Sequence, residues 1–426
     1  MGITGLLTKL KPVQKQMTLD QLNSKRLAID GYSWLHKATI GCSYELANGL
    51  NTKSYLKYFI KRIDMLKRYN IKPYFVFDGA KINVKEDTEV KRLQNRILNK
   101  KRGMSLWNAG KHLEAIEFFK RSIDVTPEMA KCIMQYCQDE NIDYIVAPFE
   151  ADSQMVYLEK QNLVDGIISE DSDLLIFGCK NLITKLNDKG EARQIESKNF
   201  NKAIKFDLSQ LTPDRLRFMV CLAGCDYTKG IPYIGLNFAY SFARSDYLLQ
   251  SVLRDYIGLN RITELEADQL LQEFYFADCS FQFQRVFCPI KDKIVTLNEI
   301  PQEYLEDPEK ANILYKSIGQ VVNKHTQTVD FVKNDSDIDH QAHKLISKGE
   351  RDPSNFQKEL FNREKLIHET GRSQYSIQYY YMNLWKKYAS PLPLNPIFNR
   401  VPIGNISMSY NCLLYTSPSP RDTERS

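Results

Sequence analysis

Two stretches of this sequence decide its fold: DYIVAPFEAD at residues 143–152 and GIISEDSD at residues 166–173. Each contains a short apolar run rich in β-branched side chains, and such runs are typical of strands that are buried in a sheet. Acidic side chains follow each run, at the point where the strand is expected to end. The two stretches therefore predict strands whose ends carry carboxylates.

The same pattern extends to both sides of these stretches. Further strand-like runs lie at Arg26–Ile29, Pro73–Phe77 and Leu182–Leu186. Between the strands, Lys53–Tyr69 places its apolar residues on one face of a helix, and Thr126-Pro127 is a typical N-cap and first helical position. Strands that alternate with helices predict an α/β fold with a mostly parallel sheet and helices on both faces.

The composition is that of an ordinary folded protein. The chain has 426 residues, of which 43% are hydrophobic and 26% charged, and 58 basic against 52 acidic side chains give a net charge of +6. This balance excludes a wholly disordered or fibrous chain, and the length predicts two to three domains. No apolar run reaches the length of a membrane helix, so we expect no membrane partner.

The nine cysteines favour a reducing compartment, because their number is odd and no Cys-x-x-Cys pair occurs. We also expect no secretory signal, since the first residues are not basic and then apolar. Cys221 and Cys225 have helical spacing and could be half of a zinc site. No second Cys/His pair accompanies them, so buried small side chains are the favoured interpretation.

Acidic residues follow four of the predicted strands. The carboxyl ends of parallel strands share one edge of a sheet, where open α/β folds bind ligands. We expect six carboxylates in one crevice: Asp30, Asp78, Glu150, Asp152, Asp171 and Asp173. Asp226 follows a predicted helix, Pro213–Ala223, and could add a seventh. Glu170 adjoins this set, but the alternation of side chains along a strand points it away. The alternative is that these acids are only loop and helix-cap residues.

Clustered carboxylates repel one another and need counter-charge. Few Lys or Arg residues lie beside these acids in the sequence, so we expect divalent cations to supply it. Oxygen ligands without His or Cys suit Mg²⁺ or Mn²⁺ rather than zinc. Two such ions can activate water and stabilise the leaving oxygen of a phosphodiester. The acids therefore indicate metal-assisted phosphodiester hydrolysis.

A basic segment, Lys81–Arg102, interrupts the alternation of strands and helices. It has eight Lys or Arg residues against three acids and is helical in composition. Lys85 and Arg92 are two helical turns apart, so they project from one face and could hold a phosphate beside the metals. The alternative is a solvated helix face.

Two further features could meet a nucleic acid. Thr212–Arg244 is expected to form a helix, a tight turn and a second helix, and Gly230 and Gly235 would let backbone N–H groups of the turn approach a phosphate. A plain αα-hairpin explains the same pattern. Tyr32 and His36 flank the first acid and could stack on a base, although an aromatic pair with this spacing more often packs against the protein.

These motifs together resemble the FEN/XPG family of structure-specific 5′ nucleases, and within it the exonuclease 1 group of eukaryotes. The resemblance covers about residues 1–325 and rests on Met1–Leu7, Val76–Gly79, Ala147–Asp152, Ser169–Asp173 and Gly224–Tyr227. It implies a PIN-like α/β nuclease core with a helical arch at about 81–125 and a helix–two-turn–helix at about 212–244. We expect residues 326–411 to be a linker or partly disordered tail and residues 412–426 to be a sequence artefact.

The resemblance also implies roles for the candidate residues. The seven acids would hold two Mg²⁺ ions, for which Mn²⁺ can substitute. Lys85 and Arg92 would be the catalytic residues that steer the scissile phosphate, and Gly2, Tyr32 and His36 would meet the unpaired DNA end.

The turn with Gly230 and Gly235 would grip duplex DNA and bind K⁺. The family commonly has Gly-Ile-Gly in this turn, where this chain has Tyr233-Ile234-Gly235.

The implied activity is that of a Mg²⁺-dependent 5′→3′ exonuclease of double-stranded DNA with 5′ flap endonuclease activity. It would act in the nucleus on DNA with a 5′ end, nick or flap, in mismatch repair, end resection and recombination. Mismatch-repair proteins are implied partners, although a tail that docks them is not recognisable. Three alternatives stay open: a flap endonuclease, a catalytically inactive module that binds DNA junctions, and an RNA-cutting PIN nuclease.

Overall fold

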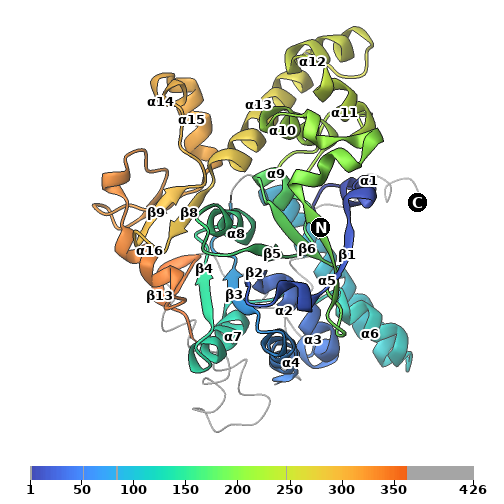
Figure 1. The fold of residues 1–426 in the computed structure, drawn as a ribbon, viewed down its shortest axis with the longest axis vertical. Coiled ribbons are helices and arrows are strands. Elements are labelled where there is room, and N and C mark those ends of the chain that lie inside the picture. The colour runs from blue at the N-terminus through green and yellow to red at the C-terminus, as the bar shows by residue number, and fades with distance from the viewer. Residues whose placement is uncertain (1, 51, 83–84, 246, 362–426) are drawn as a thin grey trace, which may run out of the picture.

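The centre of the molecule is a seven-stranded sheet with the strand order β1-β7-β6-β5-β2-β3-β4 (Figure 1). The computed structural model describes residues 2–50, 52–82, 85–245 and 247–361. The strands are β1 Lys15–Thr18, β2 Arg26–Asp30, β3 Lys72–Phe77, β4 Asp143–Val146, β5 Gly166–Ile168, β6 Asn181–Thr184 and β7 Glu191–Glu196. Strands β6, β5, β2, β3 and β4 pair in parallel with one another, and β7 and β1 extend the sheet beyond β6 in antiparallel pairing.

Alternate residues of the central strands enter two cores on opposite faces of the sheet. Ala28 and Val76 belong to the core on one face, and Ile29 and Phe75 belong to the other. The first core includes residues of α8 (Ala151–Lys160) and α9 (Leu174–Phe177), and the second includes residues of α2 (Gly31–Thr39), α4 (Ser54–Arg68) and α7 (Pro127–Asp139). The expected α/β fold, a mostly parallel sheet flanked by helices, is therefore confirmed.

The elements expected from the sequence occur close to their predicted positions, and two strands of the seven-stranded sheet, β1 and β7, were not predicted. Thr126 caps α7, because its side chain accepts a hydrogen bond from the backbone N–H of Met129. The strands β1 and β7 have the sequences KQMT and EARQIE, which contain no continuous apolar run. Strand β7 pairs along the open edge of β6, and β1 pairs with β7, and local patterns do not reveal such tertiary contacts.

The basic segment forms a long helix, α5 (Glu86–Asn108), which packs against α6 (His112–Lys120). A small separate core joins these helices to α3 (Ser43–Ala47). In it the rings of Tyr44 and Trp107 stack with centroids 4.2 Å apart, and the buried Phe119 packs beside them. The helix α5 is thus held against the body of the molecule by its far end, while its first turns reach the sheet edge.

A helical layer lies at the top of Figure 1. It consists of α10 (Pro213–Ala223), α11 (Leu236–Arg244), α12 (Leu249–Gly258) and α13 (Glu264–Phe283). Arg215 on α10 donates to the carbonyl oxygens of Phe242 and Ala243, at 2.6 and 2.9 Å, and so fixes the end of α11. Within the described ranges, no helix combines the length and the apolar character that crossing a membrane requires.

The segment after the helical layer folds back beside the sheet. It contains the hairpin of β8 (Arg285–Cys288) and β9 (Lys293–Thr296), the helices α14 (Gln302–Glu306) and α15 (Pro308–Ser317), and the pair β10 (Val321–Val322) and β11 (Val329–Asp330). It ends with α16 (His340–Ser347) and the pair β12 (Arg351–Asp352) and β13 (Asn355–Glu359). The short helix α1 (Leu6–Lys9) lies near the other end of the chain.

Residues 326–361, which were expected to begin a linker or tail, contain helices and strands that contact the rest of the molecule. Lys131 on α7 donates to the carbonyl oxygen of Gly349 at 2.6 Å, and Tyr144 on β4 donates to that of Lys348 at 2.9 Å. These contacts join α16 to the sheet although residues 326–361 are mostly polar in sequence. Residues 362–411 of the expected tail, and the expected artefact at 412–426, lie outside the described residues.

Candidate active site

The predicted acids occupy the carboxyl edge of the parallel strands. Asp30 is the last residue of β2, and Asp78 directly follows β3. Glu150 precedes α8 as its N-cap and Asp152 lies in its first turn. Asp171 and the N-cap of α9, Asp173, stand between β5 and α9, and Asp226 follows α10. Each strand ends and a helix begins at this edge, which brings acids from distant parts of the chain together.

Burial and mutual repulsion make these acids hard to ionise. Burial, with the charge of Asp78, raises the pKa of Asp30 to about 7, and burial raises that of Asp78 to about 6. Burial and the nearby Asp171 raise the pKa of Asp173 to about 8. The pKa of Asp152 is raised well above its ordinary value, by burial and by the charges of Asp171 and Asp30. The site therefore holds more negative charge than its surroundings compensate.

Backbone N–H groups hold several of these carboxylates in place. Ser33 donates its N–H to Asp30 at 2.7 Å, and Ala151 donates to Asp78 at 2.7 Å. The N–H of Asp173 donates to Asp171 at 3.1 Å. The first turn of α2, which follows β2, thus positions Asp30, and the start of α8, which follows β4, positions Asp78.

The N-terminal segment lies against the same acids. The N–H of Ile3 donates to Asp173 at 3.0 Å and to the hydroxyl of Ser172 at 2.9 Å. Gly2 has φ +80°, and a Cβ atom there would collide with the side chains of Asp171, Ser172 and Asp173. Gly2, a predicted site residue, is therefore next to the cluster.

Two cations from the start of α5 reach the cluster. Lys85, the N-cap of α5, places Nζ 2.5 Å from Glu150 and 3.7 Å from Asp226, over the ring of Tyr227. Burial opposes its charge, but Glu150 and Asp226 outweigh burial and raise the pKa of Lys85. Arg92 places a guanidinium nitrogen 3.0 Å from Asp226. The two residues are brought to one place, as their spacing predicted.

Glu170 faces away from the cluster. It accepts hydrogen bonds from the hydroxyl of Thr184 at 2.8 Å and from the N–H of Lys185 at 3.1 Å, and it pairs with Lys37 at 3.1 Å. Burial opposes the ionisation of Glu170, but these contacts outweigh burial and lower its pKa, whereas the pKa values of its neighbours Asp171 and Asp173 are raised. Glu170 therefore has a cation and hydrogen-bond donors that balance its charge, whereas Asp171 and Asp173 face the other acids of the cluster.

Sequence reasoning assigned no role to two residues that hold Glu150. The hydroxyl of Tyr227 donates to Glu150, and Gln284 donates to the same carboxylate at 3.0 Å. Gln284 is in turn held by the hydroxyl of Ser153 at 2.5 Å. Tyr227 is next to Asp226 in the sequence, and this position could have placed it at the site. Gln284 is far from the acids in the sequence, and no sequence pattern connects it with them.

The donor set fits hard divalent cations. The acids supply only oxygen ligands, which suits Mg²⁺ or Mn²⁺. Burial and neighbouring acids raise their pKa values, so a bound cation would stabilise their charged forms. In the described part of the chain, no three acidic, His or Cys side chains already converge as a formed metal site. Side chains would therefore have to turn inward to ligate an ion, and Glu150 and Asp226 would have to release Lys85 and Arg92 first.

The residues predicted to contact DNA differ in how far the fold constrains them. The ring of Tyr32 packs edge-on against Phe77, with centroids 6.2 Å apart, and His36 is exposed one turn further along α2. Gly230 has φ +72°, and a Cβ atom there would clash with the backbone of Leu222 and Gly224. Gly235 has ordinary backbone angles and open space around it, so the fold itself does not require glycine there.

Comparisons with known proteins agree with this arrangement. Residues 1–99 match the XPG N-terminal domain, and residues 141–226 match the XPG I-region. Exodeoxyribonuclease 1 of Saccharomyces cerevisiae is 47% identical over 94% of this chain and 57% of its own length. DNA damage-inducible protein DIN7 of the same yeast is 46% identical over 86% of this chain and 85% of its own length. Exodeoxyribonuclease 1 of Schizosaccharomyces pombe is 40% identical over 74% of this chain and 54% of its own length.

The chain thus spans just over half the length of the two exodeoxyribonucleases but most of the length of the third relative. The two family segments contain all seven acids and both Lys85 and Arg92. Identity and coverage of this extent make the chain a member of the XPG/FEN family of nucleases.

Proposed function

We propose that this chain is a Mg²⁺-dependent 5′→3′ exonuclease of double-stranded DNA that also cleaves 5′ flaps, and that it acts in DNA repair and recombination in the nucleus. One observation carries the proposal: acids from four strands and one helix meet at a single sheet edge, with Lys85 and Arg92 above them. The names of the relatives, two exodeoxyribonucleases and a DNA damage-inducible protein, support it.

The seven acids would hold two Mg²⁺ ions. Bound there, the ions would supply positive charge for the scissile phosphate and for the activation of water. Asp30, Asp78, Asp152, Asp171 and Asp173 all have raised pKa values, so a bound cation would stabilise the charged form of each. We infer that Glu150 and Asp226 complete the site once their cations turn to the substrate.

The chain's own cations would orient the substrate. Lys85 and Arg92 would exchange Glu150 and Asp226 for the oxygens of the scissile phosphate, which stabilises the negative charge that develops there. Helices α5 and α6 would act as the arch over the site, and Gly2, Tyr32 and His36 would line the path of the unpaired end. The turn at Gly230 between α10 and α11 would grip the duplex, with K⁺ as an expected ligand of the turn.

The decisive experiment compares acids inside and outside the cluster. Asp173→Ala or Asp171→Ala should abolish Mg²⁺-dependent cleavage of a 5′-recessed duplex while DNA binding persists. Glu170→Gln is the matched control, because this neighbour faces Thr184 and Lys37, and it should retain most of the activity. Cleavage by Asp173→Ala at the rate of the unchanged protein would refute the proposed role.

Product analysis distinguishes the alternatives within the family. A 5′-labelled blunt or nicked duplex should release mononucleotides first if the exonuclease activity dominates, and a 5′ flap should release short oligomers. Preference for the flap alone would indicate a flap endonuclease, and cleavage of a matched RNA strand would indicate an RNA nuclease. DNA binding without Mg²⁺-dependent cleavage, with EDTA as the control, would indicate an inactive binding module.

A further inference from the structure

Tyr233 has a strained backbone although its side chain is exposed. Its φ is +66°, in the left-handed region, and 75% of the residue's surface is accessible. This conformation is costly for a residue with a bulky side chain, and so little burial offers almost no compensation. Strain that packing does not explain is concentrated at functional positions. The ring of Tyr233 is therefore a candidate contact for a ligand.

Arg261, between α12 and α13, contacts the exposed ring of Tyr233. Its Cζ atom lies 5.6 Å from the centroid of the Tyr233 ring and 5.3 Å from that of Tyr256. Tyr256 is buried on α12, so it anchors the guanidinium to the protein. Cation–π attraction to the two rings holds the guanidinium in place without using its N–H groups as hydrogen-bond donors. No described residue supplies a hydrogen-bond acceptor or carboxylate to those N–H groups.

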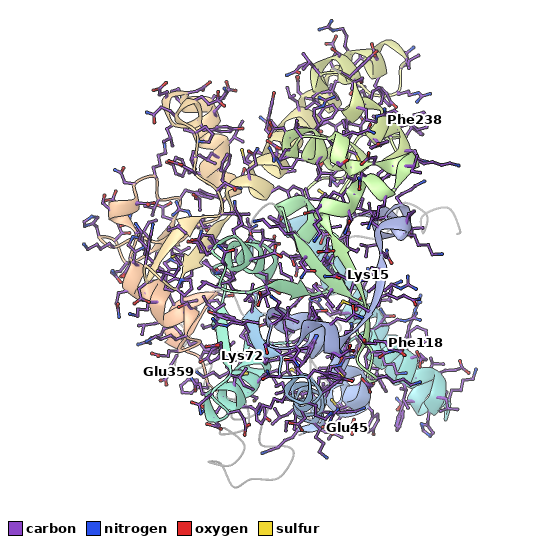
Figure 2. The ribbon with its side chains drawn as sticks, viewed as in Figure 1. Lys15, Glu45, Lys72, Phe118, Phe238 and Glu359 are labelled. Atoms are coloured by element: carbon purple, nitrogen blue, oxygen red, sulfur yellow. The ribbon has the colours of Figure 1, made fainter. Side chains whose placement is uncertain are left out.

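A guanidinium that contacts two rings and has no acceptor among the described residues can offer its N–H groups to a phosphate as two parallel hydrogen bonds. The pair lies at the turn between α10 and α11, which starts from Asp226 of the acid cluster. Figure 2 shows the exposed Phe238 on the outer side of α11, the helix that follows this turn. The surface beside the turn is thus open to a large ligand.

We propose that Tyr233 and Arg261 form a phosphate-binding pair for the backbone of duplex DNA, an inference that rests on the proposed nuclease function. Tyr233 orients Arg261, and Arg261 contacts one phosphate away from the scissile bond. The contact sets how far the duplex reaches past the acids. The family pattern commonly has glycine where Tyr233 stands.

The experiment is a phosphate-replacement scan. The unchanged protein is titrated, with Ca²⁺ in place of Mg²⁺, against labelled duplexes that each carry one neutral methylphosphonate. We expect one position at which replacement weakens binding about tenfold, the size of one good charge-assisted contact. Arg261→Gln should bind the unmodified duplex about tenfold more weakly, and it should be insensitive to replacement at that same position. Arg261→Lys should recover only part of the loss, because an ammonium cannot form the parallel pair.

Two further variants control for the loss of positive charge and for a loss of stability. Arg254→Gln on α12 removes the same charge from an exposed arginine outside the pair, and its binding should change less than twofold. Tyr233→Gly relieves the strained backbone, so it should unfold no more easily, yet it should bind the duplex several-fold more weakly.

Identical replacement profiles for Arg261→Gln and the unchanged protein would overturn the proposal, as would equal losses in Arg254→Gln and Arg261→Gln. Either result, with normal Mg²⁺-dependent cleavage by the unchanged protein, leaves the proposed nuclease function intact. If instead the unchanged protein neither binds nor cleaves the duplex, the proposed function itself fails.

Discussion

Gly2 shows how one missing side chain shapes the site. Both Gly2 and Gly5 have left-handed backbones, with φ +80° and +84°, but only Gly2 lies where a Cβ atom would meet the acids. Around Gly5 there is open space. The two glycines therefore carry similar backbone strain when substituted, and differ in their contact with the cluster.

We predict that Gly2→Ala lowers Mg²⁺-dependent cleavage at least tenfold, because the new methyl group displaces Asp171 or Asp173. Gly5→Ala is the control for backbone strain, and its cleavage rate should stay within about threefold of the unchanged protein. The measurement is the initial rate on a 5′-recessed duplex at saturating Mg²⁺. Equal losses in the two variants would assign the effect to strain rather than to the acids.

Arg92 pairs with Asp226 in this structure and would face the substrate phosphate in the proposed reaction. Arg92→Ala should therefore slow single-turnover cleavage by about 10²-fold or more, the scale of one lost electrostatic contact to a transition state, and weaken duplex binding only a few-fold. Lys91→Ala, on an exposed neighbour of the same helix, controls for the loss of positive charge. If binding and cleavage by Arg92→Ala fall equally, Arg92 is only an electrostatic contact for DNA.

The residues that sequence could identify are those whose position follows from local pattern. Asp30 and Asp78 stand at the ends of strands that are recognisable by their own apolar runs, so their shared edge could be predicted. Gln284 could not, because its contact with Glu150 spans much of the chain. The strain at Tyr233 could not either, since a sequence shows the departure from glycine but not the backbone angle.

At the scale of elements, α16 shows why polar sequence is a poor guide to a boundary. The buried His343 accepts a hydrogen bond from the N–H of Val322 at 3.1 Å through Nε2. Burial, with the charges of Arg285 and His340, lowers the pKa of His343 to about 3, against the opposing effect of Asp339. These short, mostly polar elements form because they pack together over the sheet. Local hydrophobic periodicity does not predict such tertiary contacts.

This histidine predicts how stability depends on pH. Because the folded pKa lies below the ordinary value of 6.5, unfolding takes up a proton as the pH falls from 6.5 toward 3, and the contribution of neutral His343 to stability is lost in that range. His343→Gln should be less stable than the unchanged protein at pH 7. The difference in unfolding free energy should narrow by up to about 1.4 kcal/mol per pH unit below pH 6. Urea unfolding at several pH values measures it, and a constant difference would contradict a neutral buried imidazole.

Removal of the elements after residue 325 should destabilise the whole molecule, because α16 contacts β4 and the hairpin of β8 and β9. A chain that ends at residue 325 should unfold at a lower temperature than one that ends at residue 361, measured by circular dichroism. Equal unfolding temperatures would mean that this segment covers the sheet without stabilising it.

At the scale of the whole molecule, the acid cluster opposes folding at neutral pH. The folded pKa values of Asp78, Asp30 and Asp173, about 6, 7 and 8, exceed that of an unfolded aspartate, near 4. The stability that the protonated acids provide is complete below pH 4 and is lost as the pH rises through the folded pKa values.

Bound Mg²⁺ would compensate the same charges, so it should raise the unfolding temperature more at pH 8 than at pH 6. The measurement is thermal unfolding with Mg²⁺ or EDTA at both pH values, and Asp173→Asn should reduce the difference. A Mg²⁺ effect that is equal at both pH values would show that the ions bind elsewhere.

The hydrogen bonds of Ile3 with Asp173 and Ser172 have a practical consequence. A purification tag fused ahead of residue 2 would start beside Asp171 and Asp173, where its bulk would compete with a ligand of these acids. Affinity handles therefore belong at the opposite terminus, and recombinant material with an uncleaved leader peptide should be assayed only after that leader has been removed.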